Sequence, residues 1–248
     1  MFKNKSQSIA IIPARLKSTR FPEKVLAKAK SRTLLEHTFE NTQKAALFDK
    51  IIIATDDEKV QKHAQTFCKD VFLTCNKCKS GTERIVDLLK KVPDIVDDQI
   101  IFNIQADHPT TSEKTLKDIE NILLQDPLAQ VATAVCPITT EKKFLSPHIV
   151  KCIFDRYQNA IYFSRSPIPY IRDWEMGHSC FQHIGIYAFR RKFLDTFGKF
   201  KKTPLCETED LEQLKILEYG YKIKVAVVEE NPIGIDTPED FKDFLKIL

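Results

Sequence analysis

Four basic side chains stand within ten residues near the start of the chain, in the stretch SIAIIPARLKSTRFPEKVL. They are Arg15, Lys17, Arg20 and Lys24, and Ser18 lies among them. Arginine offers a planar fork of N–H donors and lysine a mobile point charge, and both kinds of group hold polyphosphates. Basic loops are also common on protein surfaces, so a solvated loop without a ligand is an equally good interpretation of these residue types alone.

Two aspartates could supply the acidic half of a phosphate-transfer site. Asp107 lies in NIQADHP, directly after an apolar segment, and Asp236 lies in IGIDTPEDF, just before a helical segment. A pair of carboxylates beside a phosphate site is the usual protein contribution to Mg²⁺, whose other ligands are water and phosphate oxygens. Asp236 could instead cap the helix that follows it, because aspartate is a common N-cap residue.

Other catalytic and metal-binding motifs find little support. The chain contains no GxxxxGK[ST] or GxGxxG phosphate loop, no GxSxG nucleophile elbow and no HExxH zinc helix. Its seven cysteines, an odd number, argue against a framework of disulfides. Cys75 and Cys78 have CxxC spacing, but no second pair of Cys or His follows closely. Reduced thiols are therefore favoured over a zinc site.

Composition and charge exclude several classes of protein. The net charge is +4 over 248 residues, and Lys and Glu are interspersed, so no basic stripe for nucleic acid stands out. No apolar run approaches the roughly 20 residues that span a membrane. Residues 1–8 lack the apolar core of a signal peptide. We therefore expect a cytoplasmic protein that binds neither nucleic acid nor membrane.

Regular elements must position these loops, and strand-like and helix-like segments alternate along the first half of the chain. Strands are expected at residues 9–12, 50–54, 71–73, 99–103 and 131–135. Helices are expected at residues 34–46, from an N-cap at Asp56 to Phe67, at 82–91 and at 113–124. Continuously apolar strands that alternate with helices predict an α/β fold with a doubly wound, mostly parallel sheet.

The pattern changes after Pro137. The segments expected there are an antiparallel hairpin of residues 149–154 and 160–163, a strand at 183–189, a helix at 209–219 that ends at Gly220, a strand at 222–228 and a closing helix at 238–247. We predict a single domain over residues 1–248 with a small antiparallel insertion at roughly 140–205.

The loops with polar side chains lie where such a fold binds its ligand. In open α/β sheets the ligand sits beyond the carboxyl ends of the strands. Four polar segments are expected at such ends, namely residues 13–24, 55–57, 105–109 and 234–236. The first basic loop is one of them, which favours a ligand-binding role.

A set of motifs runs along nearly the whole chain. In order they are IIPARxxSTRFPxKxL, IIATDDEKV, SGTERI, NIQADHP, VKCIFD, AIYFSRSPIPY, HIGIYAFRRKFL, EDLEQLKILEYGYKI and GIDTPEDF. This set resembles that of the 3-deoxy-manno-octulosonate (KDO) cytidylyltransferases. Sialic-acid cytidylyltransferases and other sugar nucleotidyltransferases share variants of the first motif, whereas SGTERI, YFSRSPIP and HIGIYAF with EDLEQL point to the KDO branch.

The resemblance implies a nucleotide-diphospho-sugar transferase-like fold and a reaction of CTP with KDO that gives CMP-KDO and pyrophosphate, a step toward lipopolysaccharide. It also implies a homodimer, with the insertion serving sugar binding and dimerisation, and Mg²⁺ as cofactor on Asp107 and Asp236. The implied catalytic residues are Arg15, Lys24 and Asp107. The implied nucleotide-binding residues are Arg15, Ser18, Lys24, Ser80, Gly81, Thr82, Arg84 and Gln105. The implied sugar-binding residues are Gln105, Arg165, His183, Tyr187, Glu212 and Gln213.

Three positions depart from the family's usual pattern. Glu23 and Ala106 stand where the family has glycine, and His108 stands where it has glutamate. These departures motivate two alternatives: a cytidylyltransferase for another 2-keto sugar acid, such as an 8-amino KDO or a sialic acid, and a non-catalytic nucleotide-binding homologue. Because both the basic and the acidic pairs are retained, we expect an active enzyme in which the anomeric hydroxyl attacks the α-phosphorus of CTP directly. No side chain stands out as the general base.

Overall fold

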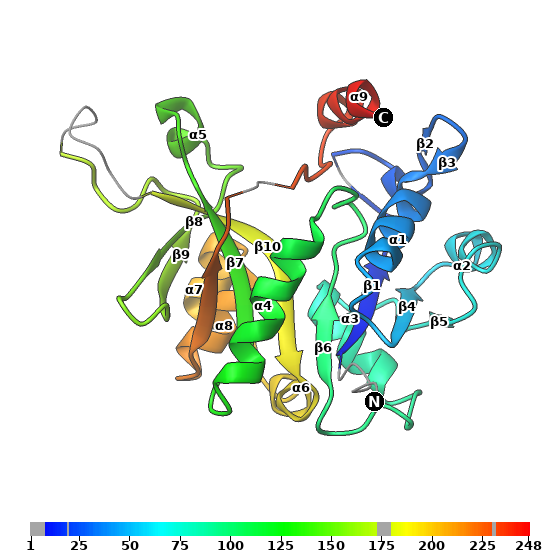
Figure 1. The fold of residues 1–248 in the computed structure, drawn as a ribbon, viewed down its shortest axis with the longest axis horizontal. Coiled ribbons are helices and arrows are strands. Elements are labelled where there is room, and N and C mark those ends of the chain that lie inside the picture. Colours follow the sequence, from blue (N-terminus) through cyan, green and yellow to red (C-terminus); the bar gives the residue numbers. More distant parts are fainter. Residues whose placement is uncertain (1–7, 19, 173–179, 230–231) are drawn as a thin grey trace, which may run out of the picture. The chain divides into compact units, whose positions relative to one another are not determined.

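The computed structural model describes residues 8–18, 20–172, 180–229 and 232–248 (Figure 1). The chain divides into two compact units. The first unit is formed by residues 1–117 and 232–248, and the second by residues 118–231. The second unit contains the strands of the predicted antiparallel insertion, whose role in sugar binding and dimerisation stays a prediction.

In its described part, the first unit contains a parallel sheet in the order β6-β1-β4-β5. The strands of this sheet are β1 (Ser8–Ala14), β4 (Lys50–Thr55), β5 (Val71–Leu73) and β6 (Ile100–Asn103). The unit also contains a separate antiparallel pair of short strands, β2 (Lys28–Ala29) and β3 (Arg32–Thr33). Its helices are the 3₁₀ helix η1 (Lys24–Leu26), α1 (Leu34–Lys44), α2 (Glu58–Ala64), α3 (Gly81–Leu89) and α9 (Pro238–Ile247). Helix α4 (Glu113–Gln125) carries the chain into the second unit.

Strand β1 lies inside this sheet and is covered on both faces. Ile9, Ala10, Ile11 and Ile12 are all almost completely buried. Neighbouring side chains of a strand point to opposite faces, so burial of all four requires cover on each side. Helices α1 and α3 both contact β1. The predicted parallel α/β arrangement is thus confirmed.

Helix α2 begins one residue later than predicted. Asp57, not Asp56, is its N-cap, and the Asp57 carboxylate accepts hydrogen bonds from the backbone N–H groups of Lys59 at 2.8 Å and Val60 at 3.3 Å. An N-cap residue needs extended backbone angles, and Asp57 has them. The carboxylate of Asp56 is thereby left for the candidate site described below.

The second unit contains a mixed sheet in the order β11-β7-β10, with β8 paired to β10 and β9 paired to β8. Its strands are β7 (Val131–Pro137), β8 (Lys151–Phe154), β9 (Ala160–Ser164), β10 (Phe181–Arg190) and β11 (Ile223–Val227). Its helices, beside most of α4, are α5 (Glu141–Leu145), α6 (Arg191–Phe197), α7 (Pro204–Glu209) and α8 (Glu212–Glu218). Helices α5 and α6 and the pair β2–β3 were not among the elements predicted from the sequence.

The predicted hairpin of β8 and β9 is confirmed as antiparallel, although its turn has no glycine. Gln158 adopts the left-handed backbone conformation that a tight turn requires, with φ of 61°. The carboxylate of Asp155 accepts hydrogen bonds from the backbone N–H groups of Tyr157 and Asn159. These side-chain contacts replace the usual glycine.

The single helix predicted at 209–219 is wrong, because two helices occupy this region. Asp210 has φ of 52°, and this left-handed residue separates α7 from α8. The predicted end of the helix is confirmed, since Gly220 follows α8 with φ of 80°.

No helix in the described part of the chain has the length and apolar character that crossing a membrane requires.

Candidate active site

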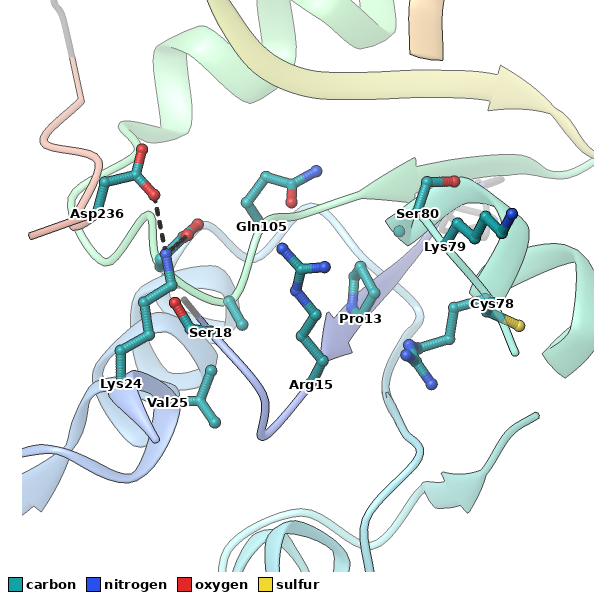
Figure 2. Close-up of a pocket in the computed structure, with 14 residues that line it drawn as sticks. Pro13, Arg15, Ser18, Lys24, Val25, Cys78, Lys79, Ser80, Gln105 and Asp236 are labelled. Atoms are coloured by element: carbon teal, nitrogen blue, oxygen red, sulfur yellow. Dashed lines mark hydrogen bonds and ion pairs between the residues drawn. The ribbon is translucent and has the colours of Figure 1, made fainter. Parts of the chain in front are cut away.

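A cavity of about 170 Å³ lies in the first unit, beside the carboxyl end of β1 and the loop that follows β6 (Figure 2). Its lining includes most of the implied nucleotide and metal residues: Arg15, Ser18, Lys24, Ser80, Gly81, Arg84, Gln105, Asp107 and Asp236. The structure therefore brings together segments that are far apart in the sequence.

Five other residues line the same cavity and were not predicted: Pro13, Val25, Cys78, Lys79 and Ala106. Each lies in the first motif's loop or within two positions of a predicted residue, so the motifs locate the segments better than the individual contacts. Thr82 does not line the cavity. It is buried, and its hydroxyl accepts a hydrogen bond from Asn103 Nδ2 at 3.2 Å.

The N-terminus of α3 forms one wall of the cavity. Ser80 caps this helix, its hydroxyl accepting from the backbone N–H of Glu83 at 3.1 Å. Gly81 lies so close to β1 that a Cβ atom there would come within 3.0 Å of Pro13 Cγ. Glycine at this position therefore lets the helix start approach the end of the strand.

Arg84 is held in a fixed orientation on the same wall. Its side chain is only 3% exposed. One guanidinium nitrogen donates to Thr74 Oγ1 at 2.7 Å and the other to Asp56 Oδ2 at 2.9 Å. Neither Asp56 nor Thr74 was among the predicted site residues, although residues 55–57 were expected at a strand end, because Asp56 was expected to cap α2.

The ammonium group of Lys24 joins the two predicted carboxylates. It donates to Asp107 Oδ2, to Asp236 Oδ1 at 3.0 Å and to the carbonyl oxygen of Ile235 at 2.9 Å. Figure 2 shows this ammonium pointing toward Asp236, with Ser18 nearby. Asp107 and Asp236, 129 positions apart in the sequence, therefore converge on one point.

Burial and charge act in opposite directions on these groups. Burial lowers the pKa of Lys24, but the adjacent Asp107 and Asp236 carboxylates outweigh it, so this pKa is raised. Burial raises the pKa of Asp107, and the charge of Lys24 outweighs it, so this pKa is lowered. Both groups are therefore ionised at neutral pH.

Asp236 does not cap α9. The N-cap is Thr237, which forms a capping box with Asp240. The carboxylate of Asp236 is directed to cations instead, since Arg20 Nη2 also contacts its Oδ1 at 2.9 Å. Of the two roles that the sequence left open for Asp236, the geometry favours the one in the site.

The segment around Asp236 reaches the site without ending a strand. Residues 234–236 were expected at a strand end, but they lie in an irregular segment before α9. The backbone N–H of Ile235 donates to the carbonyl oxygen of Asp107 at 2.9 Å, which ties the two segments together. Contact with the loop after β6, rather than sheet pairing, therefore positions Asp236.

The three unusual positions have distinct surroundings. Glu23 has φ of 53°, a conformation that favours glycine, and its carboxylate pairs with Lys59 at 2.6 Å. Ala106 is buried in the cavity lining, and its carbonyl oxygen accepts from the Thr38 hydroxyl at 2.8 Å. The His108 ring packs against Gly234, and burial lowers its pKa despite the nearby carboxylates.

The convergence of Asp107 and Asp236 fits a magnesium ion. Their oxygens contact the same cationic nitrogen, so one cation at that point would have both within reach. No group of three or more His, Cys, Asp or Glu side chains that could hold a metal occurs in the described residues. Two carboxylates suffice when substrate phosphates and water complete the ligands, as is usual for Mg²⁺.

Apart from Gln105, which lines the cavity of the first unit, the residues implied for the sugar lie in the second unit. Arg165 Nε donates to the carbonyl oxygen of Glu209 at 2.9 Å, and Nη1 to that of Pro147 at 3.2 Å. The Arg165 backbone N–H donates to the Glu209 carboxylate at 2.9 Å. The side chain of Arg165 is thus oriented by backbone carbonyls rather than by a second charge.

His183 and Tyr187 are side by side on β10. Their rings lie 5.3 Å apart, and His183 Nε2 is 3.0 Å from Thr133 Oγ1. Burial raises the pKa of the Tyr187 phenol well above its ordinary value. Glu212 and Gln213 lie in the first turn of α8, where Gln213 is buried.

Comparisons with known proteins agree with the motif set. A family model described as Cytidylyltransferase matches residues 9–223. The 3-deoxy-manno-octulosonate cytidylyltransferase of Protochlamydia amoebophila is 43% identical over 236 residues, which cover 94% of this chain and 91% of the relative. The enzyme of the same name from Chlamydia caviae is 39% identical and covers 98% of this chain and 94% of its own.

A solved structure shares the architecture of the chain. It is that of CMP:2-keto-3-deoxy-manno-octonic acid synthetase complexed with CTP, with a TM-score of 0.89 and 31% identity over 97% of each chain. A cytidylyltransferase structure from Leptospira borgpetersenii has a TM-score of 0.62 at 16% identity, over 96% of this chain and 85% of that one, and shows a shared fold.

Proposed function

The chain belongs to the cytidylyltransferase family, and we propose that it transfers the cytidylyl group of CTP to KDO, giving CMP-KDO and pyrophosphate. The observation that carries the proposal is the cavity of the first unit, where Arg15 and Lys24 stand beside Asp107 and Asp236. Basic groups to hold a triphosphate and a carboxylate pair to hold its cation are the parts that nucleotidyl transfer requires.

The reaction is a direct displacement at the α-phosphorus of CTP. The anomeric hydroxyl oxygen of KDO forms the new bond to phosphorus, its proton leaves to solvent, and the bond to the pyrophosphate oxygen breaks. Such a transfer depends mainly on positioning and charge neutralisation. Arg15 and Ser18, on the loop after β1, bind and orient the triphosphate, and Lys24 neutralises part of its charge.

We assign Asp107 and Asp236 as the residues that hold Mg²⁺. The ion, when bound there, supplies positive charge that polarises the phosphate oxygens. Arg84, fixed by Asp56 and Thr74, and the helix start at Ser80 and Gly81 bind the nucleotide. Gln105, which lines the same cavity, is assigned to both the nucleotide and the sugar acid.

We assign the sugar acid to the residues of the second unit. Arg165 offers a planar fork that suits a carboxylate, and His183 and Tyr187 on β10 and Glu212 and Gln213 on α8 complete the proposed set. The proposal also includes three properties that the family relationship supports. The enzyme acts in lipopolysaccharide synthesis, it is located in the cytoplasm, and it forms a homodimer.

No observation favours a non-catalytic homologue. Glu23, the most evident departure beside the phosphate loop, is paired with Lys59 and does not present an unpaired charge to the cavity. The other departures leave Lys24, Asp107 and Asp236 in contact.

Pyrophosphate release tests the proposal. We expect release in the presence of CTP, Mg²⁺ and KDO, and none when either CTP or KDO is omitted. Parallel reactions with 8-amino KDO and sialic acid compare the sugar acids, and KDO should give the highest kcat/KM. Pyrophosphate release from none of the three acids would show that the chain is not a cytidylyltransferase of this type.

A further inference from the structure

Lys24 uses all of its N–H donors within the protein. An ammonium group has three donors, and those of Lys24 face Asp107 Oδ2, Asp236 Oδ1 and the carbonyl oxygen of Ile235. Its side chain is 12% exposed, so solvent gives it few other partners. A lysine in this arrangement must release at least one partner before it can donate to a phosphate.

Arg20 is a second cation on the same carboxylate. Its Nη2 lies 2.9 Å from Asp236 Oδ1, the oxygen that also accepts from Lys24 at 3.0 Å. Arg20 is one of the four basic residues of the first loop, but it is not among the site residues that the motif set implies. Lys24 and Arg20 thus face Asp107 and Asp236, and we call these four residues the charge-balanced cluster, because their formal charges cancel.

A charge-balanced cluster opposes the binding of either ionic ligand alone. A divalent cation alone would meet carboxylates that are already neutralised and would force two protein cations from their partners. A triphosphate alone would draw on Lys24 and Arg20 and leave the two carboxylates unneutralised beside it. When both ligands bind, the divalent cation pairs with Asp107 and Asp236, and the triphosphate pairs with Lys24 and Arg20, which the cation has displaced.

We infer, on the basis of the proposed function, that Lys24 and Arg20 are exchangeable counter-ions. They neutralise Asp107 and Asp236 when no divalent cation is bound, and they turn to the triphosphate of CTP when a cation takes their place. The cation and CTP consequently bind with positive coupling, and the coupling is equal in both directions. Arg20 is thereby a substrate-binding residue of the site.

Metal binding without turnover tests this inference. Mn²⁺ serves as the probe, because electron paramagnetic resonance measures its free concentration directly. The full chain is titrated with Mn²⁺ in the presence and absence of α,β-methylene CTP, which cannot release pyrophosphate. We expect wild-type protein to bind Mn²⁺ at least about 10-fold more tightly with the analogue, within the usual range of coupling.

Arg20→Gln is the informative variant, because Arg20 is 50% exposed and its replacement leaves the core intact. Loss of this cation frees Asp236 in part, so the variant should bind Mn²⁺ alone roughly 3- to 10-fold more tightly than wild type. Its coupling between Mn²⁺ and the analogue should be correspondingly smaller. A purely structural role of Arg20 would not raise the affinity for Mn²⁺.

Arg32→Gln is the matched control. Arg32 is 51% exposed and forms an ion pair of the same length, 2.9 Å, with Glu40 outside the cavity. This variant should bind Mn²⁺ as wild type does. If Arg20→Gln had unchanged or weaker Mn²⁺ affinity and unchanged coupling, the inference would be overturned while pyrophosphate release still supported the proposed function. If wild type failed to bind Mn²⁺ even with the analogue, both the inference and the proposed metal site would be overturned.

Discussion

Asp107 and Asp236 are the residues on which the proposed chemistry depends most. Each Asp→Asn change keeps the shape of the side chain and removes an anionic ligand of the metal. We expect kcat/KM to fall about 100-fold or more, because the transferring phosphate loses the charge stabilisation that the metal supplies. Additional Mg²⁺ should restore part of the activity.

The double variant distinguishes one shared site from two separate effects. Because both residues serve one cation, replacing the second after the first should cost far less than its single loss. Asp243→Asn is the control, since Asp243 is exposed on α9 and pairs only with Lys246 among the described contacts. Losses that simply multiply in the double variant would contradict a shared magnesium site.

Glu23 provides a second test at the level of one residue. Both Glu23→Gly and Glu23→Ala remove the exposed ion pair with Lys59, which contributes at most about 1 kcal/mol. Only glycine also removes the cost of the left-handed backbone at φ of 53°. We expect the glycine variant to be more stable than the alanine variant by about 1 kcal/mol, as measured by urea unfolding.

CTP affinity should be nearly the same in the two Glu23 variants and in wild type, because Lys59 already neutralises this carboxylate. A clear loss of CTP binding in both variants would mean that Glu23 takes a direct part in the site.

At the level of the element, the cap of α9 can be separated from the carboxylate beside it. Thr237→Ala removes the cap and should lower the free energy of unfolding by about 1 kcal/mol, with turnover close to that of wild type. Asp236→Asn should do the reverse, with activity lost and thermal stability retained. If Asp236→Asn instead lowered stability and kept full turnover, Asp236 would be a structural residue and the metal assignment would fail.

The loop between β5 and α3 offers a test of where the nucleotide lies. Cys78 lines the cavity, whereas Cys75, three positions earlier, is exposed and lies outside it. We expect CTP with Mg²⁺ to slow the alkylation of Cys78 by iodoacetamide and to leave the rate at Cys75 unchanged, as measured by peptide mass spectrometry. Equal rates at Cys78 with and without CTP would place the nucleotide elsewhere.

Much of the element pattern could be predicted from the sequence, because buried strands and amphipathic helices have distinct periods. The strand at 71–73 and the helix at 238–247 match β5 and α9 at both ends. The break at Asp210 could not, since no glycine or proline marks it within residues 209–219. The choice between Asp56 and Asp57 as cap depends on backbone angles that two adjacent aspartates do not reveal.

The site was predictable in its segments but not in its internal contacts. The motifs identified Lys24, Asp107 and Asp236 as members of one site, although Lys24 is 83 positions from Asp107 and 212 from Asp236. That the lysine pairs with both carboxylates depends on the fold, as does the position of Arg20. The hydrogen bonds of Arg84 with Asp56 and Thr74 likewise join separate elements, and no local sequence pattern predicts them.

At the level of the whole molecule, the proposed substrates divide between the two units. The nucleotide and metal residues, from Arg15 to Gln105 and with Asp236, belong to the first unit. Arg165, His183 and Tyr187 belong to the second unit. Under this proposal, substitutions in the two units should affect different substrates.

Substitution of Arg165 tests whether the second unit binds the sugar acid. If its guanidinium binds the sugar carboxylate, Arg165→Lys keeps the charge and loses the planar fork, and should raise the KM for KDO roughly 10-fold or more while the KM for CTP changes little. Thermal unfolding of the variant shows whether the lost contacts with Glu209 and Pro147 disturb the second unit. The matched control is Arg190→Lys, because Arg190 also donates to backbone carbonyls in this unit but is not assigned to the sugar. An equal rise in both KM values for Arg165→Lys, or the same rise in KM for KDO in the control, would mean that Arg165 supports the fold of the second unit rather than binding the sugar acid.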